Sequence, residues 1–252
     1  MLKILQKRIH LPLSWTHIII IIIILIGLTF RYFFYFGQSI SEGMNNVYDN
    51  EIKHARGYCD KSAEYVLPVT HSDFLTSQEA DYILQMAKTQ FSDSQIVTGS
   101  DTNIRKSKTA WLSKTDPTIK TIIQRVCDMT NIPFENAEKM QVVHYEPNGY
   151  YNEHHDACCD DRQECIDFEK NGGQRKITML IYLSDDFEGG ATRFPNLDKE
   201  YKLPKYSGLL FHPLEKNGNK GHPLALHAGM PVTSGNKYIA NVWLREREYD
   251  AK

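Results

Sequence analysis

The chain has 252 residues, of which 31 are acidic and 29 are basic, and its formal net charge at neutral pH is −2. A chain of this length holds one sizeable domain and an appendage. Its weak net charge creates no field that would attract DNA or RNA, so no nucleic-acid partner is expected. Glycine and proline contents are near average, which excludes a low-complexity chain.

The N-terminal part of the chain contains an apolar stretch long enough to cross a membrane. Residues 11–30 include seven consecutive isoleucines and no Asp, Glu, Lys or Arg. About 20 residues at roughly 1.5 Å per residue span a hydrocarbon core of about 30 Å. Basic residues are concentrated before this stretch and only Arg31 follows it closely, so the positive-inside rule places residues 1–10 in the cytosol. We expect an uncleaved transmembrane signal-anchor over residues 11–36, with a cleaved signal peptide as the alternative.

A polar segment over residues 37–58 is expected to be a stem, and residues 59–252 are expected to form one domain. The chain has five cysteines, namely Cys59, Cys127, Cys158, Cys159 and Cys165. If the domain is lumenal, one or two disulfides and one remaining thiol are expected, but the sequence does not reveal their connectivity. The chain has no Asn-x-Ser/Thr sequon, so N-glycosylation offers no independent support for a lumenal location.

Two amphipathic helices are predicted in the first half of this domain. Ser77, followed by apolar residues at helical spacing, indicates a capped helix over about residues 77–90. Asp116 and Pro117 predict the start of a second helix, because Asp is a favoured N-cap and Pro fits the first helical position. Apolar residues keep helical spacing from Ile119 to Val126.

From about residue 139 onward, the pattern changes to short β-rich runs separated by turn residues. The predicted strands are Met140–Tyr145, Ile177–Leu183, Leu209–Phe211 and Tyr238–Leu244. Two helices followed by many short strands indicate an α+β domain whose core is an antiparallel sandwich or barrel.

The triplet His154-His155-Asp156 is a candidate source of metal ligands. On an extended strand, residues i and i+2 face the same side, so His154 and Asp156 can share a metal ion while His155 points elsewhere. A His-x-Asp pattern also recurs by chance, and a lone histidine is usually packed or solvated. The assignment therefore depends on a third ligand from another part of the chain.

His227 is the favoured third ligand, and Lys237 follows it by ten residues. Two imidazoles and one carboxylate form the facial triad that holds Fe(II) and leaves open positions in non-haem oxygenases. A buried lysine costs free energy unless it is paired, and the far carboxylate of a dicarboxylate co-substrate would pair with Lys237. The alternative for Lys237 is an ordinary charge beside a hairpin. His212 and His222 compete with His227, but neither has the same relation to a downstream lysine.

A zinc site is a further alternative for part of this region. Its ligands would be His154, Cys158, Cys159 and Cys165. Adjacent cysteines fit the usual Cys-x₂₋₄-Cys spacing of zinc sites poorly. A disulfide or plain loop thiols are therefore favoured.

Several motifs resemble, in order, those of the prolyl 4-hydroxylase family of 2-oxoglutarate dioxygenases. Residues 145–156 look like that family's Tyr-x-x-Gly-x-x-Tyr-x-x-His-x-Asp segment, with the Gly offset by one position. Residues 173–185 are similar to its next strand, and residues 189–195 resemble its Gly-Gly-x-Thr-x-Phe-Pro turn. Residues 105–112 resemble its Arg-x-Ser segment, and residues 227–243 complete the set. The resemblance covers about residues 63–248.

The resemblance implies a double-stranded β-helix, or jelly-roll, with supporting N-terminal helices. It implies Fe(II) held by His154, Asp156 and His227, and 2-oxoglutarate whose distal carboxylate binds Lys237 with help from Tyr145 and Thr192. It also implies O₂ as the oxidant and L-ascorbate as the reductant of the iron. Positions associated with the peptide groove are Tyr151, Arg175, Trp243, Arg105, Ser107 and Glu138. Core packing is the alternative for Tyr151 and Trp243, and a solvated surface is the alternative for Arg105 and Glu138.

The implied reaction is hydroxylation of prolyl residues in Pro-rich or collagen-like peptides, which gives 4-hydroxyproline, succinate and CO₂. A polyproline II peptide suits an aromatic-lined groove because it is already ordered. One rival is the same dioxygenase chemistry on another side chain or on a small molecule. Another is a non-catalytic, membrane-tethered binding module. From family and topology, we expect the domain in the lumen of the endoplasmic reticulum.

The chain departs from the family pattern at three places. His155 stands where an aromatic residue is common, and Arg245 occupies a place where some relatives carry His. Cys158, Cys159 and Cys165 lie in an insertion that follows Asp156. These departures bear on the identity of the substrate rather than on the iron chemistry.

Overall fold

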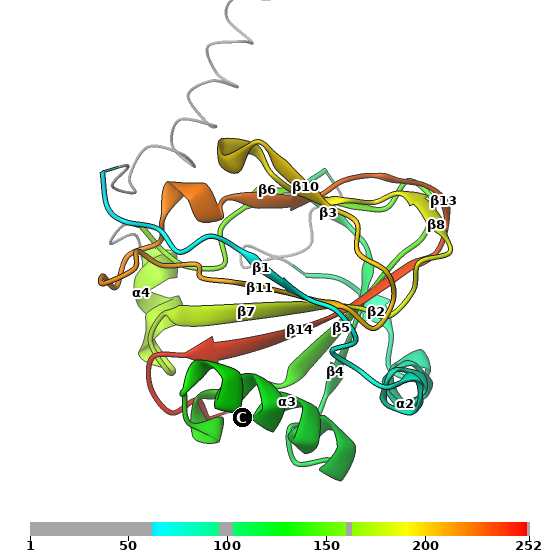
Figure 1. Cartoon of the computed structure of the whole chain (residues 1–252), viewed down its shortest axis with the longest axis horizontal. Coiled ribbons are helices and arrows are strands. Elements are labelled where there is room, and N and C mark those ends of the chain that lie inside the picture. Colours follow the sequence, from blue (N-terminus) through cyan, green and yellow to red (C-terminus); the bar gives the residue numbers. More distant parts are fainter. Residues whose placement is uncertain (1–61, 96–102, 160–162, 251–252) are drawn as a thin grey trace, which may run out of the picture. The chain divides into compact units, whose positions relative to one another are not determined.

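The computed structural model describes residues 62–95, 103–159 and 163–250. Two layers of antiparallel strands face each other in this part of the chain. Helices α2 (Ser77–Lys88) and α3 (Pro117–Thr130) cover the outer side of the larger layer (Figure 1). The expected cytosolic tail, signal-anchor and stem, residues 1–58, lie outside the described residues. Within the described ranges, no helix has the length and apolar character needed to cross a membrane.

Helix α2 (Ser77–Lys88) begins one residue earlier than its predicted cap implied. Thr76, not Ser77, is the N-cap: its hydroxyl accepts a hydrogen bond from the Glu79 backbone N–H at 3.2 Å. The Glu79 carboxylate in turn accepts from the Thr76 backbone N–H at 2.9 Å. This reciprocal capping box satisfies two N–H groups that a helix start leaves without partners. The prediction of a capped helix here is confirmed, and the assignment of the cap to Ser77 is wrong.

Helix α3 (Pro117–Thr130) starts where the sequence predicts. The Asp116 carboxylate accepts hydrogen bonds from the N–H groups of Thr118 and Ile119 at 3.0 and 3.1 Å. The helix ends at Asn131, whose φ of 54° is in the left-handed region. Asparagine tolerates this conformation better than most residues, so the helix terminates there.

The described strands form two main sheets and a hairpin. The larger sheet contains, in spatial order, β1 (Val69–His71), β11 (Gly208–Phe211), β7 (Arg175–Tyr182), β14 (Lys237–Arg245), β5 (Met140–Tyr145), β4 (Lys108–Leu112) and β2 (Ser92–Asp93). The smaller sheet contains β10 (Lys199–Tyr201), β9 (Thr192–Phe194), β12 (His227–Gly229), β6 (Tyr150–His154) and β3 (Arg105–Lys106). The hairpin pairs β13 (Val232–Gly235) with β8 (Phe187–Gly189). Three short 3₁₀ turns complete the described elements: η1 (Phe134–Asn136), η2 (Pro195–Leu197) and η3 (Pro223–Ala225).

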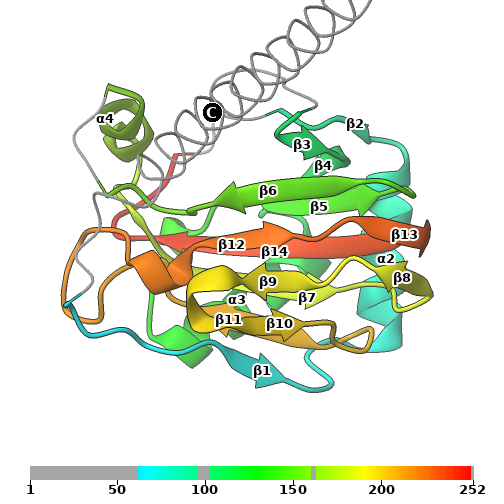
Figure 2. The same cartoon turned by 90° about the horizontal axis from the view of Figure 1, so that it is seen from above.

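The architecture is a β-rich fold consistent with a jelly-roll core, as expected from the sequence. Figure 2 shows β6, β12, β9 and β10 lying over β5, β14, β7 and β11. The predicted strand Met140–Tyr145 is found with those bounds, and the other three predicted strands begin one or two residues earlier than expected.

Strand β14 shows how the two faces of the larger sheet are used. Ala240, Val242 and Leu244 belong to the hydrophobic cluster shared with α2 and α3. Ile239 belongs to the other cluster, which lies between the sheets. Because side chains alternate along a strand, one strand supports the helices and also faces the smaller sheet. This second face carries the candidate site.

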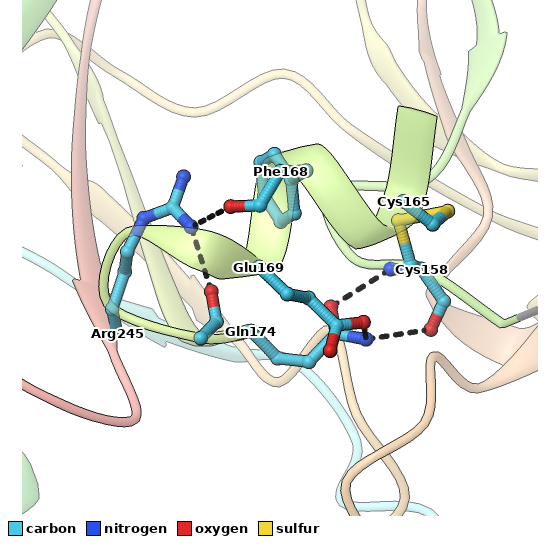
Figure 3. The surroundings of a disulfide bond; sticks show 7 residues. Cys158, Cys165, Phe168, Glu169, Gln174 and Arg245 are labelled. Carbon is cyan, nitrogen blue, oxygen red and sulfur yellow. Dashed lines mark hydrogen bonds between the residues drawn. A yellow bond between two sulfur atoms is a disulfide. The ribbon is translucent and has the colours of Figure 1, made fainter. Parts of the chain in front are cut away.

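Helix α4 (Gln163–Lys170) was not predicted from the sequence. It follows Asp156 within the cysteine-bearing insertion, and the Cys158–Cys165 disulfide closes it onto the preceding segment (Figure 3). The disulfide excludes the alternative zinc site, because two of its proposed ligands are consumed. Cys127 is the buried free thiol among the described cysteines, in agreement with the expectation of one remaining thiol.

Candidate metal centre

A cavity of about 220 Å³ is lined by residues of both sheets. Ten of the twelve site residues predicted from the sequence line it. The other two, Ser107 and Glu138, contact lining residues from behind. The fold therefore brings together side chains that come from seven different strands and the segment after β6.

The three predicted metal ligands form one cluster. Candidate ligand atoms of His154, Asp156 and His227 all lie within 4.8 Å of one another. His227 on β12 is the cross-strand partner of His154 on β6, which explains why two histidines distant in sequence become neighbours. Strand β6 ends at His154, so Asp156 lies in the bend that follows and not on the strand. The two side chains still share one side, as the spacing predicts.

Both histidines of the cluster are oriented by backbone carbonyls. Nδ1–H of His154 donates to the Asn152 carbonyl at 2.8 Å, and Nδ1–H of His227 donates to the Ala225 carbonyl at 2.9 Å. Nε2 of each ring is then left with its lone pair, as metal ligation requires. Burial, assisted by the nearby His227, lowers the pKa of His154 well below its usual value. The neutral ring is the form that can bind a metal ion.

The Asp156 carboxylate is held in a defined orientation. Its Oδ2 accepts hydrogen bonds from the Thr178 hydroxyl at 2.7 Å and from the Trp243 indole at 3.0 Å. Burial alone would raise its pKa, but His227 and Arg175 hold the pKa well below its usual range. Nη1 of Arg175 lies 3.6 Å from Oδ1. Asp156 is therefore an ionised carboxylate, which completes a donor set of two imidazoles and one carboxylate that suits Fe(II).

The rival histidines are not part of this cluster. His222 uses both ring nitrogens in the described structure: Nε2–H donates to the Ala63 carbonyl, and Nδ1 accepts from the Leu224 backbone N–H. Among the described residues, His212 and His155 do not belong to a group of three potential ligands. The placement of His155 outside the cluster agrees with its predicted direction.

Lys237 is a buried amine that faces the cavity. It is 1% exposed, and its Nζ donates to the Gly190 carbonyl at 2.7 Å. No ion pair to a carboxylate is found for it among the described residues, and burial lowers its pKa to about 7. The alternative of an exposed hairpin charge is therefore wrong. An incoming carboxylate would supply the missing partner.

The two other predicted co-substrate residues lie beside Lys237. Tyr145 is its cross-strand partner, and the amine lies 5.3 Å from the centre of the Tyr145 ring. The Thr192 hydroxyl is 3.0 Å from the Tyr182 hydroxyl. Tyr145 and Thr192 both line the cavity. The structure thus groups the three residues as the resemblance implies, and their contact with 2-oxoglutarate stays a prediction.

The predicted peptide-groove residues form two stacked pairs with a polar residue behind each. The Arg175 guanidinium lies 3.6 Å from the centre of the Trp243 ring, and Arg105 lies 4.6 Å from the centre of the Tyr151 ring. Glu138 accepts from Arg175 at 2.6 and 2.9 Å, and the Ser107 hydroxyl accepts from Arg105 at 2.9 Å.

These pairs decide two of the alternatives left open by the sequence. Arg105 and Glu138 are buried, so a solvated surface position is wrong for both. Tyr151 and Trp243 line the cavity, so core packing alone does not describe them. Ser107 and Glu138 support the groove from behind, and peptide contact by the six residues stays a prediction.

Further cavity residues were not among the predicted site residues. They are Gln95, Trp111, Gln141, Leu180, Gly229, Ile239 and Asn241. The sequence did contain a signal for Ile239 and Asn241. Lys237 and Trp243 lie on one strand, and strand alternation places positions 239 and 241 on the same face. Gln141 and Asn241 are joined by a hydrogen bond of 3.1 Å. Gln95 and Trp111 come from other elements, and only the folded arrangement brings them to the cavity.

Sequence comparisons relate this geometry to known proteins. Residues 140–245 match the model of the 2OG-Fe(II) oxygenase superfamily. A prolyl 4-hydroxylase homologue of Acanthamoeba polyphaga mimivirus is 45% identical over 207 residues, which cover 82% of this chain and 86% of that protein. Prolyl 4-hydroxylase 5 of Arabidopsis thaliana is 34% identical and covers 72% of this chain and 69% of its own length.

A comparison with solved structures agrees with the sequence comparisons. The viral collagen prolyl hydroxylase of Paramecium bursaria Chlorella virus-1, in its 2OG complex, has a TM-score of 0.58 and 30% identity. The match covers 71% of this chain and 95% of the viral enzyme. A Pseudomonas putida prolyl-4-hydroxylase is 14% identical with a TM-score of 0.51 and supports the fold alone.

Proposed function

This chain belongs to the prolyl 4-hydroxylase family of 2OG-Fe(II) oxygenases, and on this premise we propose that it hydroxylates prolyl residues in Pro-rich or collagen-like peptides. The main support for this proposal is that His154, Asp156 and His227 cluster in one cavity that the buried Lys237 also lines. O₂ is the oxidant in this reaction, and bound Fe(II) would activate it: one oxygen atom would enter a prolyl C–H bond, and the other would convert 2-oxoglutarate to succinate and CO₂.

Each residue of the cluster has a defined task in this proposal. His154 and His227 hold Fe(II) through Nε2, because Nδ1–H of each ring is bound to a carbonyl. Asp156 provides the anionic ligand, and its Thr178 and Trp243 contacts keep the carboxylate from rotating. These contacts preorganise the ligands before substrate arrives.

Lys237 binds the distal carboxylate of 2-oxoglutarate in this proposal. The amine is buried, so its attraction for an anion is stronger than in water. Tyr145 and Thr192 flank the position and are proposed to complete the co-substrate site. L-ascorbate is proposed as the reductant that keeps the iron as Fe(II).

The peptide is proposed to bind along the aromatic side of the cavity. Tyr151 and Trp243 contribute aromatic rings to the cavity lining, and an aromatic-lined groove suits a polyproline II segment. Arg175 and Arg105 lie over these rings and offer donors to the carbonyl groups of the peptide. Collagen-like and Pro-rich peptides share these features.

Mass spectrometry of the full-length chain with Fe(II), 2-oxoglutarate and ascorbate tests the proposal. We expect poly-proline or collagen-like peptides to gain the mass of one oxygen atom per modified proline, and the gain to disappear without 2-oxoglutarate. If 2-oxoglutarate is decarboxylated in a His154-dependent way but no proline is modified, another side chain or a small molecule is the substrate. If neither reaction occurs, the rival of a non-catalytic binding module is favoured.

A membrane location is part of the proposal. We infer that residues 11–36 are a single-pass signal-anchor with residues 1–10 in the cytosol, residues 37–58 as a stem and residues 59–252 in the lumen of the endoplasmic reticulum. The apolar composition and flanking charges of the N-terminal segment support this topology. The Cys158–Cys165 disulfide is also typical of an oxidising compartment.

Protease protection in microsomes tests this topology. We expect the domain to resist added protease until the membrane is permeabilised. We also expect the chain to remain with the membrane at alkaline pH. Digestion of the domain in intact microsomes would contradict the proposed orientation, and release at alkaline pH would contradict the anchor.

A further inference from the structure

The segment 157–174 joins two residues that line the cavity. It begins directly after Asp156 and ends directly before Arg175, and both of these residues line the cavity. Its helix α4 is closed onto the start of the segment by the Cys158–Cys165 disulfide (Figure 3). The contacts of α4 show how this segment is connected to the flanking cavity residues.

Gln174 ties the end of this segment to its beginning. Its side-chain Oε1 accepts from the Cys158 backbone N–H at 2.9 Å, and its Nε2 donates to the Cys158 carbonyl at 3.0 Å. Nε2 also donates to the Glu169 carboxylate of α4 at 2.7 Å. The disulfide and this amide together hold α4 on the residue that precedes Arg175.

Arg245, at the end of β14, holds the other end of α4. One of its guanidinium nitrogens, Nη1, donates to the carbonyls of Phe168, Asn171 and Gly173 at 3.0, 3.1 and 2.6 Å. The guanidinium lies 4.1 Å from the centre of the Phe168 ring. A cation suits this position, because the last carbonyls of a helix lack intrahelical donors and carry partial negative charge.

Arg245 also contacts Glu138, the carboxylate that holds the predicted groove residue Arg175. Nε of Arg245 donates to Oε1 of Glu138 at 2.7 Å. That oxygen also accepts from Nε of Arg175 at 2.6 Å, and Oε2 accepts from Nη2 of Arg175 at 2.9 Å. Burial alone would raise the pKa of Glu138, but the two arginines lower it. Arg175 therefore lies against Trp243 with its orientation set by a carboxylate that Arg245 also holds.

We propose that Arg245 is a positioning residue for the peptide site. It connects helix α4, which the Cys158–Cys165 disulfide joins to the preceding segment, to Glu138, and Glu138 holds the Arg175 guanidinium over Trp243 at the cavity. Arg245 itself is 4% exposed and does not line the cavity. The inference rests on the proposed function, since Arg175 and Trp243 are proposed to contact the peptide.

Steady-state kinetics of the full-length chain with Arg245→Gln test this inference. The substitution removes one of the two cations that hold Glu138, so the carboxylate that orients Arg175 can shift. We expect the KM for the peptide to rise about tenfold, which is less than the roughly hundredfold effect that a 1 Å misplacement can have. The KM for 2-oxoglutarate should not change, because the contacts of Lys237 are untouched. Arg245→Lys should recover part of the loss, because it restores the charge.

Arg247→Gln is the matched control. Arg247 is exposed and donates to the Glu169 carbonyl of α4 at 3.1 Å. It has no hydrogen bond to Glu138 in the described structure. Both KM values should remain at the wild-type level. A rise of the peptide KM in this control equal to that in Arg245→Gln would overturn the inference, because contact with α4 alone would then explain the effect.

A second variant tests the disulfide without altering Arg245. Cys158→Ser/Cys165→Ser should raise the peptide KM several-fold and accelerate amide hydrogen exchange in α4. Exchange in β5, β7 and β14 should be unchanged, which would establish that the domain stays folded. Cys159→Ser is its control, because Cys159 is also disulfide-bonded but not to Cys165. If the double variant loosens α4 and leaves the peptide KM unchanged, α4 has no part in positioning and the inference fails.

The remaining outcomes are also decisive. If Arg245→Gln raises the KM values for peptide and 2-oxoglutarate equally, the effect is a general loosening and the positioning role is wrong. If the wild-type chain modifies no peptide, the proposed function fails, and amide exchange then decides the inference alone. Faster amide exchange at residues 138 and 175 in Arg245→Gln would support the positioning role of Arg245, and unchanged exchange at these residues would overturn it.

Discussion

Lys237 shows how a single buried side chain can favour ligand binding and reduce stability. Its amine has one described hydrogen bond, to the Gly190 carbonyl, and it lies 5.3 and 5.7 Å from the centres of the Tyr145 and Tyr182 rings. Burial of a cation without a carboxylate partner carries a free-energy cost. If the carboxylate of 2-oxoglutarate binds here as proposed, it would remove that cost, and Lys237 would couple co-substrate binding to the stability of the domain.

Lys237→Met should therefore stabilise the ligand-free protein and weaken co-substrate binding. Because the folded-state pKa of about 7 lies below the unfolded value of 10.5, the cost is complete below about pH 7 and disappears as the pH rises to 10.5. The Tm of the variant should exceed that of the wild type by a few degrees at pH 7. Calorimetry should show this difference shrinking toward pH 10.

The KM for 2-oxoglutarate of the same variant should rise about tenfold to a hundredfold, as expected for loss of a charged hydrogen bond. Lys176→Met is the control, because Lys176 is exposed on β7. It should change neither property. A lower Tm for Lys237→Met than for the wild type at pH 7 would contradict the unpaired-charge interpretation.

The substitution His227→Ala tests the assignment of His227 as a metal ligand. The substitution leaves one imidazole and one carboxylate, so we expect loss of iron binding and of turnover. Calorimetric titration of the anaerobic protein with Fe(II) measures the first, and 2-oxoglutarate consumption measures the second. His212→Gln is the comparison, because His212 lies outside the described cluster, and it should retain both properties. Full activity in His227→Ala would refute the assignment.

Periodicity predicted which elements exist more accurately than where they begin. The start of α3 is specified by local sequence, because three signals agree on it: the N-cap Asp116, Pro117 at the first helical position, and the apolar spacing that follows. In α2, Thr76 and Ser77 are both acceptable caps, and only Thr76 is in position to pair reciprocally with Glu79. The strands extend beyond their apolar runs because ladder hydrogen bonds depend on the partner strand rather than on side-chain character. Helix α4 is short and polar, and Arg245, which donates to its Phe168 carbonyl, is 77 residues away in the sequence.

Substitution of the two candidate caps of α2 tests this reasoning. Thr76→Ala removes the hydroxyl that accepts from the Glu79 N–H, and it should lower the free energy of unfolding by about 1 kcal/mol. Ser77→Ala should have little effect, because its hydroxyl contacts only the exposed Gln78 side chain in the described structure. Urea denaturation measures both. An equal loss in the two variants would contradict the capping box.

The described residues form two hydrophobic clusters, and neither includes a candidate metal ligand. One lies between the helices and the larger sheet, and the other lies between the two sheets. The cavity opens beside the second cluster, where Phe194 and Phe211 pack against His227. We therefore expect the fold to form without the metal, in contrast to small metal-dependent domains that unfold without it.

Chelation of the metal should therefore abolish turnover without unfolding the domain. Near-ultraviolet circular dichroism should be unchanged after chelation. Fe(II) with 2-oxoglutarate should raise the Tm by a few degrees, since ligand at a hundredfold excess over its Kd stabilises a protein by about 2.7 kcal/mol. Cooperative unfolding on chelation would contradict a metal-independent core.

The sequence by itself determined the fold class, the family and the chemistry of the candidate ligands. His154 and Asp156 are two residues apart, and Lys237 follows His227 by ten residues. Each of these signals lies within a short stretch of the chain. Strand alternation could also have placed positions 239 and 241 on the face of Lys237, although they were not among the predicted site residues. Such inferences succeed because neighbours along the backbone have a regular geometry whatever surrounds them.

Only the tertiary structure decided which distant residues meet. The pairing of β12 with β6 places His227 opposite His154, and Arg245 at the end of β14 contacts both Glu138 and the carbonyl of Phe168 in α4. The Cys158–Cys165 connection likewise depended on which thiols approach each other. Local periodicity specifies the direction of a side chain but not the partner strand, because that choice depends on the packing of the whole domain.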